Sequence, residues 1–102
     1  MFLIEILLPL YDNSGTPIPR NDFERTRGEL LERFGGLTAH MQAPAEGLWK
    51  DDANQAKRDD IVVLEVMVPE IERAWWSDYR RTIEQRFRQE SIVIRSQQVE
   101  IL

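Results

Sequence analysis

Residues 58–69, with the sequence RDDIVVLEVMVP, decide how the rest of this chain can fold. Within them, residues 61–68 are apolar except for Glu65. That length and the many β-branched side chains are typical of a strand in the middle of a sheet, covered on at least one face. We therefore place the remaining segments by asking which of them pair with this strand and which of them cover it.

The segments at the start of the chain predict a strand and a helix. Residues 2–8 (FLIEILL) form the strand, which we expect to stop at Pro9 because proline has no N–H to donate to a ladder. After a loop with two prolines, Asn21 is expected to cap a helix, since a glutamate follows it three residues later. Gly35 and Gly36 end that helix.

The second strand is expected to begin at residue 37. Residues 37–42 (LTAHMQ) alternate as a half-buried strand does, 43–45 (APA) interrupt it, and 47–50 (GLWK) resume it after a bulge. Residues 50–60 (KDDANQAKRDD) are charged and predict a solvated hairpin tip. A calcium loop is not expected there, because the glycine and the terminal glutamate of an EF-hand are missing.

After the central strand, residues 71–90 predict a second helix and residues 91–95 a last strand, with a short extended piece at 99–102. Each helix has one apolar stripe and one surface ion pair at i,i+4 spacing. The expected pairs are Glu29 with Arg33 and Glu84 with Arg88. The stripes consist of Phe23, Leu30, Leu31 and Phe34 in the first helix, and of Trp76, Tyr79, Ile83 and Phe87 in the second, with Trp75 beside them.

These elements follow one another as strand, helix, strand, strand, helix, strand. Two helices on one face of a four-stranded antiparallel sheet close such a pattern economically. The order resembles the ferredoxin-like α+β fold, with strand order 4-1-3-2, and the resemblance covers nearly the whole chain. It implies a single domain over residues 1–102.

Several short segments also resemble features of a group of short, uncharacterised bacterial proteins: FGGLTAH, GLWK, RAWW-x-x-YR and RQESIVIR. That group implies no activity. Ferredoxin-like chains with an uncovered sheet face often resemble dimeric α/β-barrel proteins, in which two sheets pack face to face around a pocket. No catalytic motif of that superfamily stands in the sequence, so the resemblance implies an architecture only.

Composition sets aside several classes of function. The chain has 102 residues, no cysteine and a formal net charge of -5. Disulfides, thiol catalysis and cysteine-bound zinc are therefore excluded. The acidic balance argues against nucleic acid or an anionic membrane as partner, because both are bound through clustered positive charge.

The apolar first ten residues do not read as a signal peptide. They lack a positively charged start and a small-residue cleavage site, and they carry Glu5 in the middle. They are also too short to span a membrane. A buried first strand in a cytoplasmic protein is the expectation.

The sheet face that the helices leave uncovered is the candidate site. Strand alternation places Glu5, Glu65 and Arg95 on that face, one from each of three neighbouring strands. Their neighbours there are Leu3, Leu7, Ile61, Val63, Met67 and Val93, with Thr38, His40 and Gln42 from the second strand. An arginine beside two carboxylates would relieve their repulsion, and without it burial would raise a glutamate pKa.

Three interpretations of this face stay open. It is a solvated surface with scattered charges, or a partly buried polar cluster inside a dimer interface, or a catalytic carboxylate pair. His40, the only histidine, is expected at a surface or interface rather than in a metal site, because no ligand spacing accompanies it. Trp49 is a further candidate for ligand binding or for the interface.

RNA-recognition domains share this fold but stack bases on aromatic residues of the two central strands. The corresponding positions here are Leu, Glu, Val and Met. The arginines of the second helix alternate with acidic and amide side chains, so their field is largely neutralised locally. No phosphate loop or nucleophile elbow occurs either.

Two hypotheses of function follow. The first is a homodimeric module, without cofactor, whose open sheet face supplies self-association and binds a small ligand. The second is a cofactor-independent enzyme of dimeric α/β-barrel type that uses Glu5 or Glu65 as general base. A closed cavity that reaches both glutamates would favour the enzyme.

Overall fold

The apolar run that dominates the sequence forms one uninterrupted strand, β3 (Ile61–Val68). The computed structural model describes residues 1–42 and 61–102. Within them, β3 is an inner strand of a four-stranded sheet, as its composition predicts.

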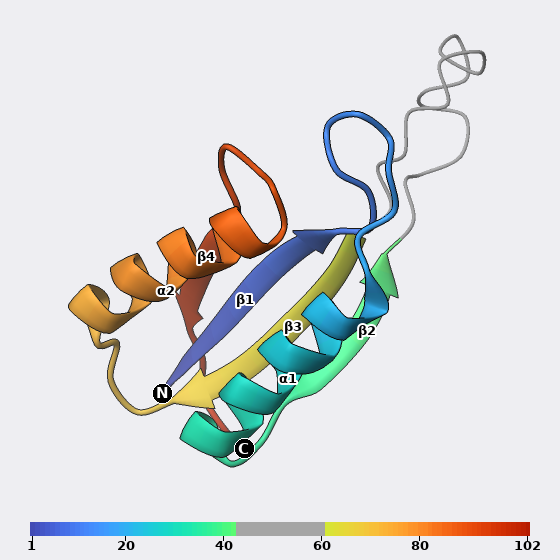
Figure 1. Cartoon of the computed structure of the whole chain (residues 1–102). Helices are drawn as coiled ribbons and strands as arrows, with labels where there is room; N and C mark the ends of the chain where they lie inside the picture. Colours follow the sequence, from blue (N-terminus) through green and yellow to red (C-terminus); the bar gives the residue numbers. More distant parts are fainter. Residues whose placement is uncertain (43–60) are drawn as a thin grey trace, which may run out of the picture.

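The sheet is antiparallel throughout. β3 pairs with β1 (Phe2–Pro9) on one side and with β2 (Thr38–Gln42) on the other, and β4 (Ile94–Gln98) pairs with the outer side of β1. The resulting order, β2-β3-β1-β4, is the predicted order 4-1-3-2 seen from the opposite edge (Figure 1).

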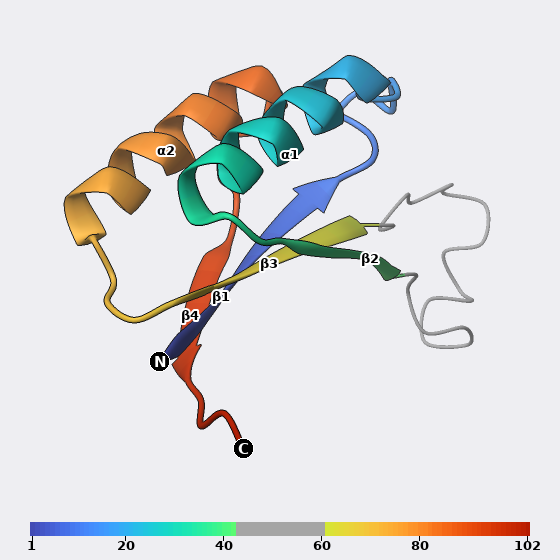
Figure 2. The ribbon, with the colours of Figure 1, turned by 90° about the horizontal axis from the view of Figure 1, so that it is seen from below.

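Two helices, α1 (Arg20–Phe34) and α2 (Arg73–Arg86), complete a ferredoxin-like βαββαβ topology. Figure 2 shows both helices on the same side of the sheet, so within residues 1–42 and 61–102 no helix covers the other face. The predicted fold class is confirmed.

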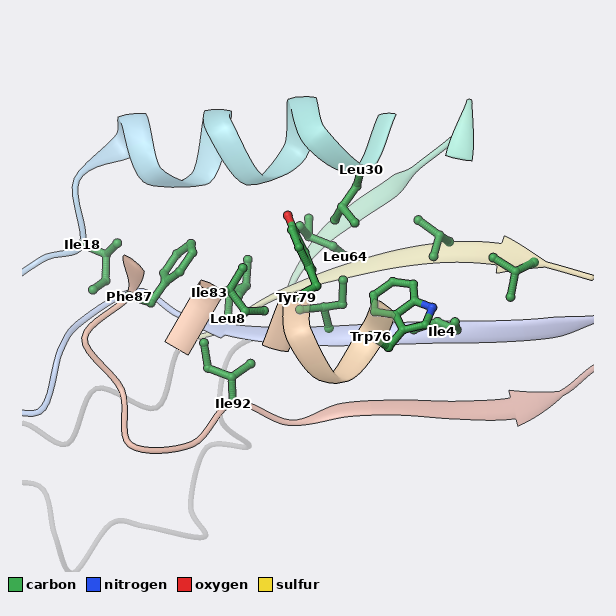
Figure 3. Close-up of a cluster of buried hydrophobic side chains, with 13 residues drawn as sticks. Ile4, Leu8, Ile18, Leu30, Leu64, Trp76, Tyr79, Ile83, Phe87 and Ile92 are labelled. Carbon is green, nitrogen blue, oxygen red and sulfur yellow. The ribbon is translucent and has the colours of Figure 1, made fainter. Parts of the chain in front are cut away.

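The core lies between the sheet and the helices, where alternate strand residues meet the two apolar helix stripes (Figure 3). Each fully buried aliphatic or aromatic side chain contributes about 1.5–3 kcal/mol through removal of its surface from water. The residues labelled in that cluster are Ile4, Leu8, Ile18, Leu30, Leu64, Trp76, Tyr79, Ile83, Phe87 and Ile92. The predicted stripe of α2 is confirmed, since all four of its members are buried.

Pro9 belongs to β1, whereas the sequence predicted that the strand would stop before it. The Leu7 N–H donates to the Val93 carbonyl (3.0 Å), so the backbone N–H and C=O groups of the odd-numbered residues of β1 point toward β4 and not toward β3. The nitrogen of Pro9 therefore points away from β3, toward the side of β4, whose pairing with β1 does not extend as far as Pro9. Pro9 can pair with Ile61 because its missing N–H is not needed for a hydrogen bond to β3.

The start of α1 differs from its prediction, and its end does not. Pro19 is the residue before the first turn, with ψ at 139°, and no side chain caps the helix. Asn21 lies inside the first turn, so the predicted cap is wrong: the extended proline already fixes where the helix begins. Gly35 ends the helix at φ 76°, and its N–H donates to the Leu31 carbonyl (2.8 Å), as predicted.

The inner stripe of α1 contains a polar residue that the apolar pattern did not include. Leu31 is exposed, which contradicts its prediction, and Thr26 is fully buried in the stripe. The Thr26 hydroxyl donates to the Asp22 carbonyl (2.8 Å), which satisfies it within the helix.

α2 and β4 are both shorter at their junction than predicted. The helix ends at Arg86, because Arg88 takes a left-handed conformation with φ at 55°. That turn directs Arg88 toward Asp12 (3.5 Å) and not toward Glu84, so the predicted pair is wrong. β4 begins at Ile94, and no strand is assigned within the final residues 99–102, although the Val99 N–H still donates to the Met1 carbonyl (2.9 Å).

Three predictions lie outside the described residues: the interruption at 43–45, the resumed strand at 47–50 with Trp49, and the hairpin tip at 50–60. In the described parts of the chain, neither helix is long and apolar enough to cross a membrane.

Candidate functional site

One residue from each strand forms a straight row across the open face of the sheet. The register pairs Thr38 with Glu65, Glu65 with Glu5, and Glu5 with Arg95. We call these four residues the open-face row. Its three charged members are the ones that strand alternation placed on this face.

The two glutamates of the row face each other at the closest kind of cross-strand position. Because the odd-numbered residues of β1 exchange their backbone hydrogen bonds with β4, Glu5 and Glu65 are a non-hydrogen-bonded pair. In such pairs the Cα atoms lie about 4.5 Å apart and the side chains come closer than elsewhere in the ladder. Two carboxylates there repel each other unless a proton or a cation intervenes.

Arg95 supplies the cation. Its Nε–H donates to Glu5 Oε1 at 2.8 Å, from the strand on the other side of Glu5. The Glu5 side chain is only 19% exposed. The hydrogen bond from Arg95 lowers the pKa of Glu5, against the opposing effect of partial burial, and the charge of Arg95 and a hydrogen bond with the Glu65 carboxyl lower it further.

Glu65 has a partner of its own on the opposite side. His40 Nε2 lies 3.3 Å from Glu65 Oε2, and in the tautomer with hydrogen on Nε2 the ring donates to the carboxylate. His40 pairs with Val63 in the ladder, so it reaches Glu65 diagonally, two residues along β3. The open face therefore carries two back-to-back pairs, His40 with Glu65 and Arg95 with Glu5.

Apolar side chains surround these pairs along the strands. Val63 is fully buried, and Leu3 and Leu7 are half-buried. Met67 and Val93 are 49% and 52% exposed. The face is thus mixed, with its charges concentrated in one row.

A hollow of about 240 Å³ reaches the β2 end of the row, at Thr38 and Glu65. Its lining does not include Glu5, so it is not a cavity shared by both glutamates. The lining residues are Leu3, Phe34, Gly36, Leu37, Thr38, Glu65, Val66 and Met67.

A metal centre finds no support in the described residues. No group of three histidine or carboxylate side chains there is arranged to hold an ion. The Trp49 candidate lies outside those residues, so its role stays a prediction.

Sequence reasoning missed a second polar cluster, between the two helices. Arg86 binds Glu29 with both of its terminal nitrogens, at 2.9 and 3.0 Å, and also donates to the Thr26 hydroxyl at 2.8 Å. The Tyr79 hydroxyl donates to Glu29 Oε1 at 2.9 Å. We call Thr26, Glu29, Tyr79 and Arg86 the helix clamp.

The helix clamp is partly shielded from water, and its polar groups are paired with one another. The Arg86 side chain is 7% exposed. Burial pushes the pKa of Glu29 upward, but hydrogen bonds from Arg86 and Tyr79 outweigh it and leave that pKa below its ordinary value. Burial and the same carboxylate raise the pKa of Tyr79. A cluster so completely satisfied positions α1 against α2 and offers no free group for chemistry.

The helix clamp also explains why one predicted ion pair is wrong. Glu29 faces Arg86 across the helix interface and not Arg33 along its own helix. Arg33 instead binds Glu72, before α2, and lies over the ring of Trp75 with its guanidinium carbon 4.2 Å from the ring centre.

No family model matches this chain, and no curated protein or solved structure matches it significantly. The ferredoxin-like topology is therefore what links it to known proteins, and a shared topology carries no activity with it.

Proposed function

We propose that this protein is a homodimeric module in which two sheets pack face to face through their open faces, as in dimeric α/β-barrel proteins. The space between the sheets would bind a small molecule. The observation that carries this proposal is the internal pairing of the charges on the open face.

Internal pairing makes the open face fit to be buried. A charge removed from water is tolerated when it is paired and hydrogen-bonded, and is costly otherwise. Arg95 pairs with Glu5, and the His40 ring lies within hydrogen-bond distance of Glu65, so each carboxylate has a polar partner within the chain.

Apolar area supplies the driving force for association. Met67 and Val93 stand exposed beside the half-buried Leu3 and Leu7, on a face that no helix of the described residues covers. They form two groups, Leu3 with Met67 and Leu7 with Val93, one on each side of the open-face row. Exposed apolar area on a folded protein often marks an interaction surface.

The hollow beside Glu65 is the natural place for the small molecule. Leu3 and Met67 offer it apolar contact, and the Glu65 carboxylate offers a hydrogen-bond acceptor. The ligand class that suits this lining is a compact, largely apolar molecule with at least one N–H or O–H donor. Its volume alone is small for a ligand site, and a facing sheet would enlarge it.

Sedimentation velocity of the wild type against Met67→Asp tests the dimer. We expect a dimer at micromolar concentration for the wild type and a monomer for the variant, because the new carboxylate would be buried without a partner. Leu31→Asp is the matched control, since Leu31 is also an exposed leucine-sized side chain but lies on α1. Loss of the dimer in both variants, or a monomeric wild type at high concentration, would overturn the proposal.

The enzyme hypothesis keeps one specific observation in its favour. Since Arg95 holds the pKa of Glu5 low, Glu5 is a weak base, and the histidine–carboxylate contact of His40 and Glu65 is the better candidate for proton transfer. On this hypothesis Glu65→Gln keeps the fold and the dimer and abolishes turnover of a small substrate. A ligand-binding module instead retains saturable binding without turnover in the wild type.

A further inference from the structure

A second hollow, of about 210 Å³, lies between α2 and β4, an edge strand of the sheet. Its lining contains three arginines and two serines but no acidic residue. We call it the edge groove. It is lined by Ile71, Arg73, Trp76, Ser77, Arg80, Ile94, Arg95 and Ser96.

α2 presents positive charge to this groove along one face. Arg73, Ser77 and Arg80 recur at steps of four and three residues, which puts them on the same side of the helix. Arg73 forms no ion pair with any residue that the structure describes, and Arg80 reaches Glu84 only at 3.8 Å. Both guanidinium groups therefore remain available to an anionic partner.

β4 presents unused backbone groups to the same groove. The Val93 carbonyl accepts the Leu7 N–H, and the Val99 N–H donates to the Met1 carbonyl. The backbone N–H and C=O groups of every second residue of this segment therefore point toward β1. The residues between them, Ser96 among them, direct their N–H and C=O groups away from β1. Such an open edge can pair with another extended chain.

We propose that the edge groove binds an extended, acidic peptide segment of another protein, which adds to the sheet as a fifth strand beside β4. Main-chain hydrogen bonds to the edge would supply affinity, as in other complexes formed by strand addition. Acidic side chains at alternate positions of the peptide would all point to the helix side, toward Arg73 and Arg80.

Charge decides between this occupant and a second copy of the chain. Pairing two β4 edges would bring the positively charged α2 residues of one groove toward those of the other copy, and like charges repel. An acidic segment is attracted by the same side chains. The proposal concerns an edge of the sheet and does not rest on association through the open face.

Fluorescence anisotropy with a short labelled peptide that alternates glutamate with valine tests the proposal. We expect saturable binding that a lysine–valine peptide does not show. The double change Arg73→Ala and Arg80→Ala should weaken it at least about tenfold, as expected for loss of charge-assisted hydrogen bonds. Arg81→Ala is the matched control, because Arg81 lies on α2 outside the groove and pairs with Asp78.

Ser96→Pro separates strand addition from simple anion binding. It removes an N–H that faces outward, so circular dichroism and the denaturation midpoint should stay near those of the wild type while peptide binding is lost. Glutarate binding as tight as that of the peptide, and insensitive to Ser96→Pro, would show a small-anion site and overturn the proposal. So would equal binding of both peptides, no peptide binding by the wild type, or a dimer in sedimentation that Ser96→Pro dissociates.

Discussion

Glu5 is the residue at which the opposing electrostatic influences on the open face meet. A carboxylate lies directly across from it on β3 and a guanidinium on β4. The strand pattern alone placed Glu5, Glu65 and Arg95 on one face, but the pattern has a period of two and leaves the register undetermined. Their alignment in one row follows from the pairing of whole strands, which the sequence of any single strand does not contain.

Arg95→Met tests whether this row acts as a unit. Removing the arginine leaves two facing carboxyl groups without a nearby strong cation, so we expect a loss of about 1 kcal/mol or more in the free energy of unfolding at neutral pH. Arg95 lowers the folded-state pKa of Glu5, so its contribution is present above the ordinary glutamate value and is lost as pH falls through the lowered one. Urea denaturation at pH 7 and near pH 3 should show the loss shrinking on acidification.

Arg81→Met is the control for that comparison. Arg81 is exposed and pairs with Asp78 on the surface of α2, where ion pairs contribute little. Its effect should stay within about 0.5 kcal/mol at both pH values. An equally small, pH-independent effect of Arg95→Met would mean that the open-face row is a set of separately solvated charges.

At the scale of secondary-structure elements, the helix clamp fixes how α1 and α2 lie against each other. Thr26 and Glu29 are three residues apart on α1, and Tyr79 and Arg86 are seven residues apart on α2. Each pair therefore lies on one face of its helix. Those spacings were readable in the sequence. Which face met which was not, because two helices that cover one sheet can be rotated about their axes in many ways.

Arg86→Met should therefore destabilise the protein by about 2–3 kcal/mol, since it leaves a partly buried Glu29 carboxylate without its main partner. Arg25→Met is the matched control: Arg25 also pairs with Glu29, at 3.6 Å, but is 65% exposed, so its loss should cost less than about 0.5 kcal/mol. Urea denaturation measures both. Adding Glu29→Met to Arg86→Met should restore part of the stability, because the partly buried carboxylate that lost its main partner is then also removed. A further loss would contradict the role assigned to the clamp.

The elements that the sequence predicted well are those whose pattern is continuous. β3 and the inner stripe of α2 have uninterrupted apolar periodicity, and their residues are buried as expected. The errors cluster where local backbone geometry decides: Pro19 sets the start of α1, and the left-handed Arg88 ends α2 early. Each depends on a single φ or ψ that the periodicity of side chains does not encode.

At the scale of the whole molecule, the two faces of the sheet differ in what covers them. The helices and the core cover one side, and the open face carries paired charges among exposed apolar residues. The edge at β4 is a separate surface with a positive groove. The two surfaces would serve different partners, a second copy on the face and an acidic strand at the edge.

Folding and association should then be coupled, and this coupling can be measured without knowing a ligand. A homodimer gains stability by mass action, so a hundredfold rise in protein concentration should add about 2.7 kcal/mol per dimer to the apparent free energy of unfolding. Urea midpoints at low and high micromolar protein should separate accordingly for the wild type and for Leu31→Asp. They should coincide for Met67→Asp, whose open face can no longer be buried. Coincident midpoints for the wild type would instead mean that the face stays in water, and that the contacts of Glu5 with Arg95 and of Glu65 with His40 serve the isolated sheet.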